Sequence, residues 1–213
     1  KARERQLEQV AANTDTVTVD VSGLQNVHSA KLPASIVEKA EQSGAELTVA
    51  LPAGSVTLDT AALAAVGSGR DVTVSVQQAT LTDAQRAAVG SLAQVAVVVD
   101  VNVLTGTAKP SGFNGGKLTV SIPYTLKSGE DPAKLQVWFI RGDGSIENKG
   151  GSYDRKTSCF VFSTEYLSRC LLVNTAGAQR FADVPASAYY AEAVAWAVNN
   201  GTTGGTSAAM FSP

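Results

Sequence analysis

The side chains that most often carry out catalysis are scarce in this sequence and lie far apart. His28 is the single histidine, and Cys159 and Cys170 are the two cysteines. One imidazole and two thiols cannot form a zinc site of the usual ligand spacing. His28 lies between polar residues, and no serine near it is marked as an activated nucleophile. We therefore expect no enzymatic activity, no metal, no cofactor and an exposed loop position for His28.

The carboxylates have positions that are typical of structural roles. Asp15, Asp20, Asp59, Asp71 and Asp83 come at the edges of predicted strands and helices. Aspartate at such edges caps a helix or closes a turn. The sequence therefore predicts no pair of carboxylates for acid–base chemistry.

One tripeptide has two interpretations. Arg141-Gly142-Asp143 is the motif that integrins recognise, and a protruding hairpin turn would expose it. Gly142-Asp143-Gly144 is also what a tight two-strand turn requires for its own backbone, and we favour this interpretation. With Ser145 and Glu147 the segment still has too few oxygen ligands for a calcium loop.

A second tripeptide, Tyr166-Leu167-Ser168, occupies the place where some self-cleaving β-modules carry His-Phe-Ser. In those modules the histidine helps the serine hydroxyl to attack the preceding peptide carbonyl. Tyr166 replaces that histidine, so the base is missing and self-cleavage is not expected. The alternative is a β-turn in which Leu167 points inward.

Aromatic residues suggest a sugar-binding surface as an alternative function. Trp138, Phe139 and Tyr153 lie in a strand-rich part of the chain. Because successive residues of a strand face opposite sides, one of Trp138 and Phe139 is expected in the core and the other on the surface. A platform of Trp138 and Tyr153 would make this part a carbohydrate-binding or adhesin module.

The two cysteines flank a predicted hairpin. If its turn is centred between Thr164 and Glu165, Cys159 lies directly opposite Cys170. Opposed residues in a non-hydrogen-bonded pair have Cα atoms about 4.5 Å apart, which is close to disulfide geometry. A shift of one residue places the two sulfurs on opposite faces instead. The sequence leaves both a disulfide and two buried thiols open.

The composition bounds the class of protein. The chain has 213 residues, of which 44% are hydrophobic and 17% charged, with 19 Gly and 7 Pro. This indicates a folded, turn-rich chain of one large or two small domains. The net charge of -2 gives no basic patch, so neither nucleic acid nor an anionic membrane is an expected partner. No apolar run is long enough for membrane insertion, and no signal peptide begins at Lys1.

The first half of the chain predicts alternating strands and helices. Residues 1–13 are typical of a short linker helix, and residues 14–106 of an α/β module. Asp59 is placed to cap a helix, and Thr82 with Gln85 forms a capping box. We expect helices at 33–43, 59–67 and 82–92, and strands at 16–21, 46–51, 72–76 and 95–104. The long last strand is placed in the centre of a mixed or parallel sheet.

Residues 107–178 predict strands and almost no helix. The expected strands lie at 117–122, 135–141, 145–149, 159–163 and 170–173. Short spacing between strands with glycine turns is typical of a small sandwich or barrel. This segment is therefore predicted to be a β-rich module.

The last segment, 181–213, predicts one short amphipathic helix at 187–199. Ser187 is a plausible N-cap, and Gly201 follows the last apolar residue as a left-handed stop. Tyr190, Val194 and Ala197 fall on one stripe of that helix. One helix and a loop cannot bury a core alone, so we interpret the chain as a fragment of a longer protein.

Residues 181–213 resemble the first half of an S-layer homology repeat. The matching features are Phe181-x-Asp183-Val184-Pro185, Tyr189-Tyr190, Ala193-Val194, Trp196-Ala197, Gly201, Gly205 and Phe211-x-Pro213. Two features depart from the family. The second helix with its Thr-Arg-Ala-Glu type motif is absent, and Thr202 stands where a hydrophobic residue is usual. Residues 115–173 also resemble the strand-rich module that often precedes such repeats in surface proteins of gut Firmicutes.

The resemblance implies an extracellular protein of a Gram-positive bacterium, held at the cell wall or S-layer. Such repeats bind a secondary cell-wall polysaccharide, and Asp183 with Tyr189 or Tyr190 would lie near the ligand. The family also needs the arginine of its second helix, whereas residues 181–213 contain no Lys or Arg. The polysaccharide is therefore an expected partner of the full-length protein and not of this fragment.

These parts combine into one interpretation of the chain. The predicted fold class is α+β: a mixed sheet with flanking helices at 14–106, a small all-β sandwich-like module at 107–178 and a partial helical S-layer homology repeat at 179–213. The predicted function is a non-enzymatic spacer or display module of a wall-anchored surface protein. The alternative is the carbohydrate-binding or adhesin module described above.

Overall fold

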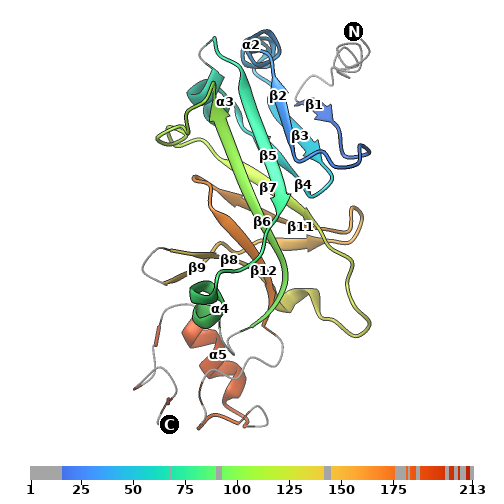
Figure 1. Cartoon of the computed structure of the whole chain (residues 1–213). Coiled ribbons are helices and arrows are strands. Elements are labelled where there is room, and N and C mark those ends of the chain that lie inside the picture. Colours follow the sequence, from blue (N-terminus) through green and yellow to red (C-terminus); the bar gives the residue numbers. More distant parts are fainter. Residues whose placement is uncertain are drawn as a thin grey trace.

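Two β-sheets dominate the structure (Figure 1). It is a computed structural model that describes residues 16–67, 69–89, 93–141, 145–175, 181, 183–185, 188–199, 202–203, 206 and 210–211. The predicted linker helix at 1–13 lies outside these residues. In the described part, each sheet has six strands.

The first sheet, sheet A, has the order β1-β3-β4-β7-β11-β10. Its strands are β1 (Thr16–Asp20), β3 (Glu46–Leu51), β4 (Gly54–Leu58), β7 (Leu118–Pro123), β11 (Cys159–Thr164) and β10 (Ser152–Asp154). β1 and β3 pair in parallel, and the other neighbours are antiparallel. β3 and β4 form a tight hairpin in which Leu51 lies opposite Gly54.

The second sheet, sheet B, has the order β2-β5-β6-β12-β8-β9 and is antiparallel throughout. Its strands are β2 (Ser29–Leu32), β5 (Val72–Gln78), β6 (Gln94–Thr105), β12 (Arg169–Asn174), β8 (Leu135–Ile140) and β9 (Ile146–Asn148). β6 is the longest strand. It pairs with β5 along one edge and with β12 along part of the other.

The predicted α+β fold class is wrong, because the chain forms a β-sandwich-like fold of two mostly antiparallel sheets. The strands show the reason. β4, β5 and β7 alternate buried and half-buried residues, with Val, Leu or Ile inward and Ser or Thr outward. Such alternation belongs to sheets with one face in the core and one toward solvent, whereas strands covered by helices on both faces are continuously apolar.

Both sheets take strands from either side of the predicted boundary between residues 106 and 107. In sheet A, β4 pairs with β7 from Ser55↔Ser121 to Leu58↔Leu118. In sheet B, β6 pairs with β12. The segments that were predicted as an α/β module and a β-rich module therefore share their sheets.

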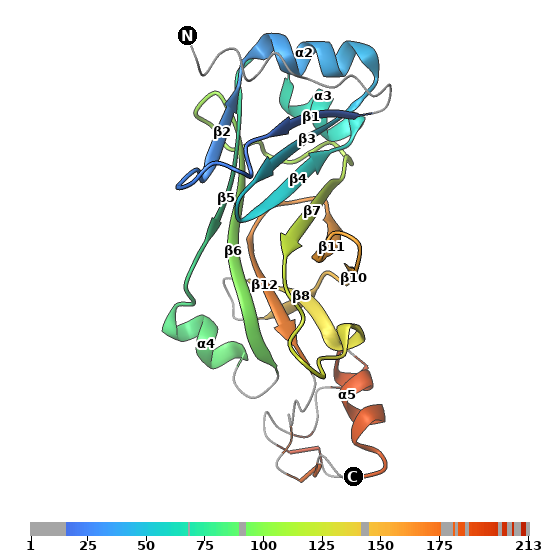
Figure 2. The same ribbon diagram turned by 90° about the vertical axis from the view of Figure 1, so that its right-hand side faces the viewer.

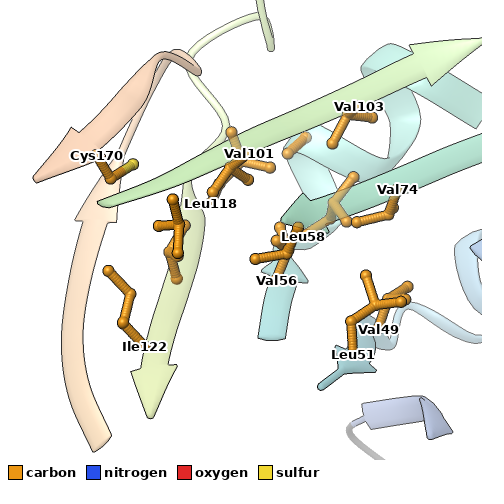
Figure 3. Packing of buried hydrophobic residues seen from close by; sticks show 14 of the residues in the cluster. Val49, Leu51, Val56, Leu58, Val74, Val101, Val103, Leu118, Ile122 and Cys170 are labelled. Atoms are coloured by element: carbon orange, nitrogen blue, oxygen red, sulfur yellow. The ribbon is translucent and has the colours of Figure 1, made fainter. Parts of the chain in front are cut away.

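The main core lies between the two sheets and runs through both segments (Figure 3). Val49, Val56 and Leu118 face it from sheet A, and Val74 and Val101 face it from sheet B. Each buried side chain of this size contributes about 1.5–3 kcal/mol through removal from water. The core, rather than helix formation, is therefore the main source of stability.

Helices form at the four positions predicted at 33–43, 59–67, 82–92 and 187–199, with ends that differ by up to four residues. The helices are α2 (Ala34–Ser43), α3 (Thr60–Gly67), α4 (Asp83–Val89) and α5 (Ala191–Asn199). Asp59 caps α3 by accepting a bond from the Ala62 N–H at 2.7 Å, and Thr82 and Gln85 form the reciprocal capping box. Between 115 and 175, the described residues contain one helical element, the short 3-10 helix η1 (Pro132–Lys134).

The helices lie at the ends and sides of the sandwich (Figure 2). α2 and α3 lie together at one end and insert Val37, Leu63 and Val66 into the main core. α4 lies beside the other half of the molecule, where Val89 packs with Trp138 and other residues on the outer face of sheet B. α5 lies at the end opposite to α2.

Candidate functional site

The two ends of the C-terminal segment meet in a small cluster. Phe181, Val184 and Val194 are buried together, and the rings of Phe181 and Phe211 lie 5.4 Å apart. Asp183 Oδ1 accepts a hydrogen bond from the Phe211 N–H at 2.8 Å. The first and the last motifs of the sequence resemblance are therefore in direct contact, and Asp183 has a structural role in joining them.

The two tyrosines predicted near a ligand differ in their surroundings. Tyr189 is 97% exposed, whereas Tyr190 packs against the cluster of Phe181 and Val194. Their rings lie 5.1 Å apart in an edge-to-face arrangement. Trp196 on α5 is 64% exposed. Tyr189 lies in the turn before α5 and Trp196 lies within α5, so this segment exposes two large aromatic rings.

The predicted sugar platform of Trp138 and Tyr153 does not form. Trp138 is 3% exposed and lies on the outer face of sheet B with Val89, Leu171 and Val173. Tyr153 is on β10 of sheet A, where its hydroxyl donates to the Tyr124 carbonyl at 2.9 Å. The prediction that one of Trp138 and Phe139 is on the surface is also wrong, because α4 and its flanking segments cover the side that Trp138 faces.

The predicted hairpin that would bring Cys159 opposite Cys170 is wrong as well. Cys159 begins β11 in sheet A and Cys170 lies on β12 in sheet B, so residues 165–168 cross between sheets. Both cysteines are free thiols. Cys170 is 1% exposed, and burial raises the pKa of its thiol to about 12. Cys159 is half-buried and directs its thiol to the Thr157 carbonyl.

A polar cluster that the sequence did not indicate surrounds Glu147. Arg141 and Lys149 form ion pairs with the two carboxylate oxygens at 2.7 and 2.9 Å. The hydroxyl of Tyr166 donates to the same carboxylate. Lys149 Nζ also lies over the Tyr166 ring, 4.4 Å from its centre. Glu147, Lys149 and Tyr166 border a cleft of about 410 Å³.

The neighbours of Glu147 keep its carboxylate in the ionised form. Bonds from Tyr166, Lys149 and Arg141 lower the pKa of Glu147 from 4.5 to about 2. A carboxylate held so firmly in its ionised form is a poor proton donor or acceptor near neutral pH. The cluster therefore stabilises the rim of the sandwich, where Tyr166 links the 165–168 crossover to sheet B.

A second charged pair joins β12 to β6 and α4. Arg169 donates to both oxygens of Asp100 at 2.8 and 3.0 Å. It also donates to the Thr80 carbonyl and to Gln85 Oε1, each at 3.1 Å. The bond to Asp100 raises the pKa of Arg169. Arg169 thereby holds the start of α4 against sheet B.

The other residues considered in the sequence do not come together in a common site within the described part of the chain. His28 is exposed, as predicted, and its carbonyl accepts a bond from Val76. Leu167 packs against the main core, as the turn interpretation of Tyr166-Leu167-Ser168 predicts. Of the Arg141-Gly142-Asp143 tripeptide, only Arg141 lies within the described residues. Among those residues no group of three or more His, Cys, Asp or Glu is placed to hold a metal.

No model of a known protein family matches the chain, and no curated protein is similar to it. No helix within the described part of the chain has the length and apolar character to span a membrane.

Part of the Glu147 cluster could have been predicted from the sequence. Arg141 and Glu147 flank a predicted hairpin turn, so a cross-strand ion pair between them was foreseeable. The contacts of Tyr166 with Glu147 and of Arg169 with Asp100 could not be foreseen. Both depend on strands that come from distant parts of the chain and on the crossover between the sheets.

Proposed function

We propose that this chain is a non-enzymatic module of a bacterial cell-surface protein, in which the sandwich serves as a spacer or display body and residues 181–213 belong to the wall-anchoring region. The observation that carries the proposal is the contact between Phe181, Asp183 and Phe211. The residues at both ends of the resemblance to an S-layer homology repeat fold onto each other, as parts of one small unit do.

The charged groups of the sandwich support a non-enzymatic role. Asp59 caps α3, Asp100 is held by Arg169, and Glu147 is held by three donors. Each is thus engaged in fixing one element to another. Catalytic carboxylates instead need a pKa near the working pH and access to a substrate.

The proposed partner is a secondary cell-wall polysaccharide, bound by the full-length protein. Within residues 181–213, the exposed ring of Tyr189 is free to stack on a sugar, but Asp183 is already bonded to the backbone of Phe211. An anionic polysaccharide also needs cationic donors, which this segment lacks. The chain alone is therefore expected to bind purified walls weakly.

Surface labelling tests the location. Antibodies raised against the whole chain should label intact, unpermeabilised cells of the producing organism. Extraction of the walls with agents that remove secondary polysaccharide should release the full-length protein. Labelling that appears only after permeabilisation would contradict the proposal. In a parallel assay, tight pull-down of the 213-residue chain by purified walls would refute the argument about cations.

A further inference from the structure

Sheet B contains a notch where β6 extends beyond the end of its pairing with β12. β12 pairs with β6 only over Gln94–Asp100, whereas β6 continues to Thr105. From Val101 to Leu104, β6 pairs with β5 on its other edge, and no described strand lies on the β12 side. A bridge between Thr105 and Ala108 closes the far end. We call this space the β6 notch.

The β6 notch is a polar cleft of about 340 Å³. The side chains that line it include Asp100, Asn102, Lys109, Leu167, Ser168 and Arg169. Asp100 and Asn102 are two residues apart on β6, so both point to the outer face of sheet B while Val99 and Val101 face the core. Leu167 and Ser168 come from the crossover that leads into β12.

The charges in the notch are arranged as one fixed pair and one available cation. Arg169 and Asp100 neutralise each other through two hydrogen bonds, and their side chains are 28% and 22% exposed. Lys109 is exposed and forms no ion pair with any residue that the structure describes. Within the same described residues, the side chains of Asn102 and Ser168 also form no hydrogen bond.

These groups select a class of ligand by its chemistry. The Lys109 ammonium can form an ion pair with an anionic group. The Asn102 amide and the Ser168 hydroxyl can form hydrogen bonds with neutral polar groups. Asp100 keeps acceptor capacity beyond its two bonds to Arg169, which suits hydroxyl donors and repels a small multivalent anion. The notch also has room for far more than one water, which occupies about 30 Å³.

We propose that the β6 notch binds an acidic sugar unit, that is, a hydroxyl-rich ring that carries one carboxylate, as in a uronic acid. The carboxylate pairs with Lys109, and the ring hydroxyls bond with Asn102, Ser168 and the open oxygen positions of Asp100. Leu167 gives the ring a small apolar contact. The unpaired β6 edge supplies backbone donors and acceptors beside it.

This site is distinct from the C-terminal segment and does not depend on the proposed surface location. It uses β6 and the 165–168 crossover, whereas the wall-directed residues lie in 181–213. Surface labelling and sugar binding can therefore fail independently.

The test is a titration of the full chain with sodium glucuronate, followed by backbone and side-chain amide shifts in NMR spectra and by calorimetry. The expected result is saturable shifts at residues 100–102, 109 and 167–169. Glucose lacks the carboxylate, and acetate lacks the hydroxyls, so both should bind at least about tenfold more weakly. Inorganic phosphate tests for attraction of any anion.

Matched variants assign the roles. Lys109→Ala and Asn102→Ala should each weaken glucuronate binding, Lys109→Ala by about tenfold or more. Lys39→Ala, which removes an exposed lysine on α2, should leave it unchanged. Circular dichroism checks that each variant is folded. Equal binding of glucuronate, acetate and phosphate would overturn the proposal, as would affinity that is insensitive to both notch variants or shifts confined to residues outside the notch.

Discussion

The sandwich and the C-terminal segment bury very different amounts of apolar surface. Among the residues that the structure describes, the main core contains thirty buried residues, drawn from both sheets, two helices and the connecting loops. The cluster of residues 181–211 contains three, Phe181, Val184 and Val194, among the described residues. Large aromatic rings are buried in the sandwich at Phe139 and Phe160, whereas Tyr189 and Trp196 of the segment are exposed.

The difference in buried apolar surface means that the sandwich can fold by itself, whereas the C-terminal segment needs further contacts to be stable. Ordering one residue costs about 1–2 kcal/mol of conformational entropy. Three buried side chains, at about 1.5–3 kcal/mol each, offset only a few ordered residues. The segment should therefore open well before the sandwich. Its exposed aromatic rings are the surface through which a further contact would stabilise it.

The largest expected effect comes from equivalent truncations in the two regions. Phe160→Ala removes a fully buried ring from β11 and should lower the free energy of unfolding of the sandwich by about 3–5 kcal/mol. Phe181→Ala should open the segment and leave the sandwich transition unchanged. Trp138 fluorescence during urea unfolding, in a Trp196→Phe background, reports the sandwich.

Hydrogen exchange of peptides from 181–199 reports the segment in the same samples. It should be fast in Phe181→Ala and unaltered in Phe160→Ala under native conditions. A shift of the Trp138 transition by Phe181→Ala as large as that by Phe160→Ala would show that the two regions unfold as one unit.

A glycine in the sandwich should be nearly as sensitive. A Cβ on Gly116 would lie 2.1 Å from the Ala62 nitrogen, because the loop before β7 packs directly on the first turn of α3. Gly116→Ala should therefore cost about 1–3 kcal/mol. Gly112→Ala is the matched control, because a Cβ there meets nothing within 4 Å. Equal stability of the two variants in urea would contradict this packing.

A smaller effect is expected at the rim of the sandwich and depends on pH. The pKa of Glu147 falls from 4.5 to about 2 on folding, so its contribution to stability is complete above pH 4.5 and is lost as the pH falls through about 2. After solvent screening we expect about 1–2 kcal/mol. Glu147→Gln should thus destabilise the sandwich at pH 7 and have little effect at or below pH 2.

Glu165→Gln, at an exposed position by the same cleft, is the control and should change stability little at either pH. A constant difference between the wild type and Glu147→Gln across the whole range would mean that Glu147 acts through packing and not through its charge.

Local structure was predictable because its causes are local. Asp59 and the pair Thr82 and Gln85 cap their helices as the sequence indicates, and Gly44 ends α2 in a left-handed conformation. The strands at 46–51, 72–78 and 118–123 follow from alternation of apolar and polar residues. Such signals depend only on neighbours in the chain.

The pairing of strands was not predictable from such signals. β11 and β12 are separated by four residues, a spacing typical of a hairpin, yet the chain at 165–168 crosses from sheet A to sheet B, with Leu167 packed against the main core. That crossing separates the cysteines. It also brings Tyr166 to Glu147 and leaves β6 unpaired at the notch. The burial of Trp138 likewise required α4 to return over sheet B.

The smallest perturbation, chemical labelling of the two thiols, tests whether the sandwich stays closed while the segment opens. The unfolded, unreduced protein should titrate with two free thiols per chain. In the native state Cys159 should react first with a thiol reagent, because it is half-buried at the start of β11. Cys170 should remain unreactive, because it is 1% exposed and its pKa of about 12 leaves almost no thiolate at neutral pH.

In Phe181→Ala the labelling of Cys170 should stay as slow as in the wild type, since the sulfur lies in the core between the sheets (Figure 3). In Phe160→Ala it should accelerate, because the sandwich opens more often when its free energy of unfolding is lower. Cys170→Ala removes the slow phase and confirms its assignment. Rapid labelling of Cys170 in Phe181→Ala would show that the segment, despite its three buried residues, protects one end of the sandwich.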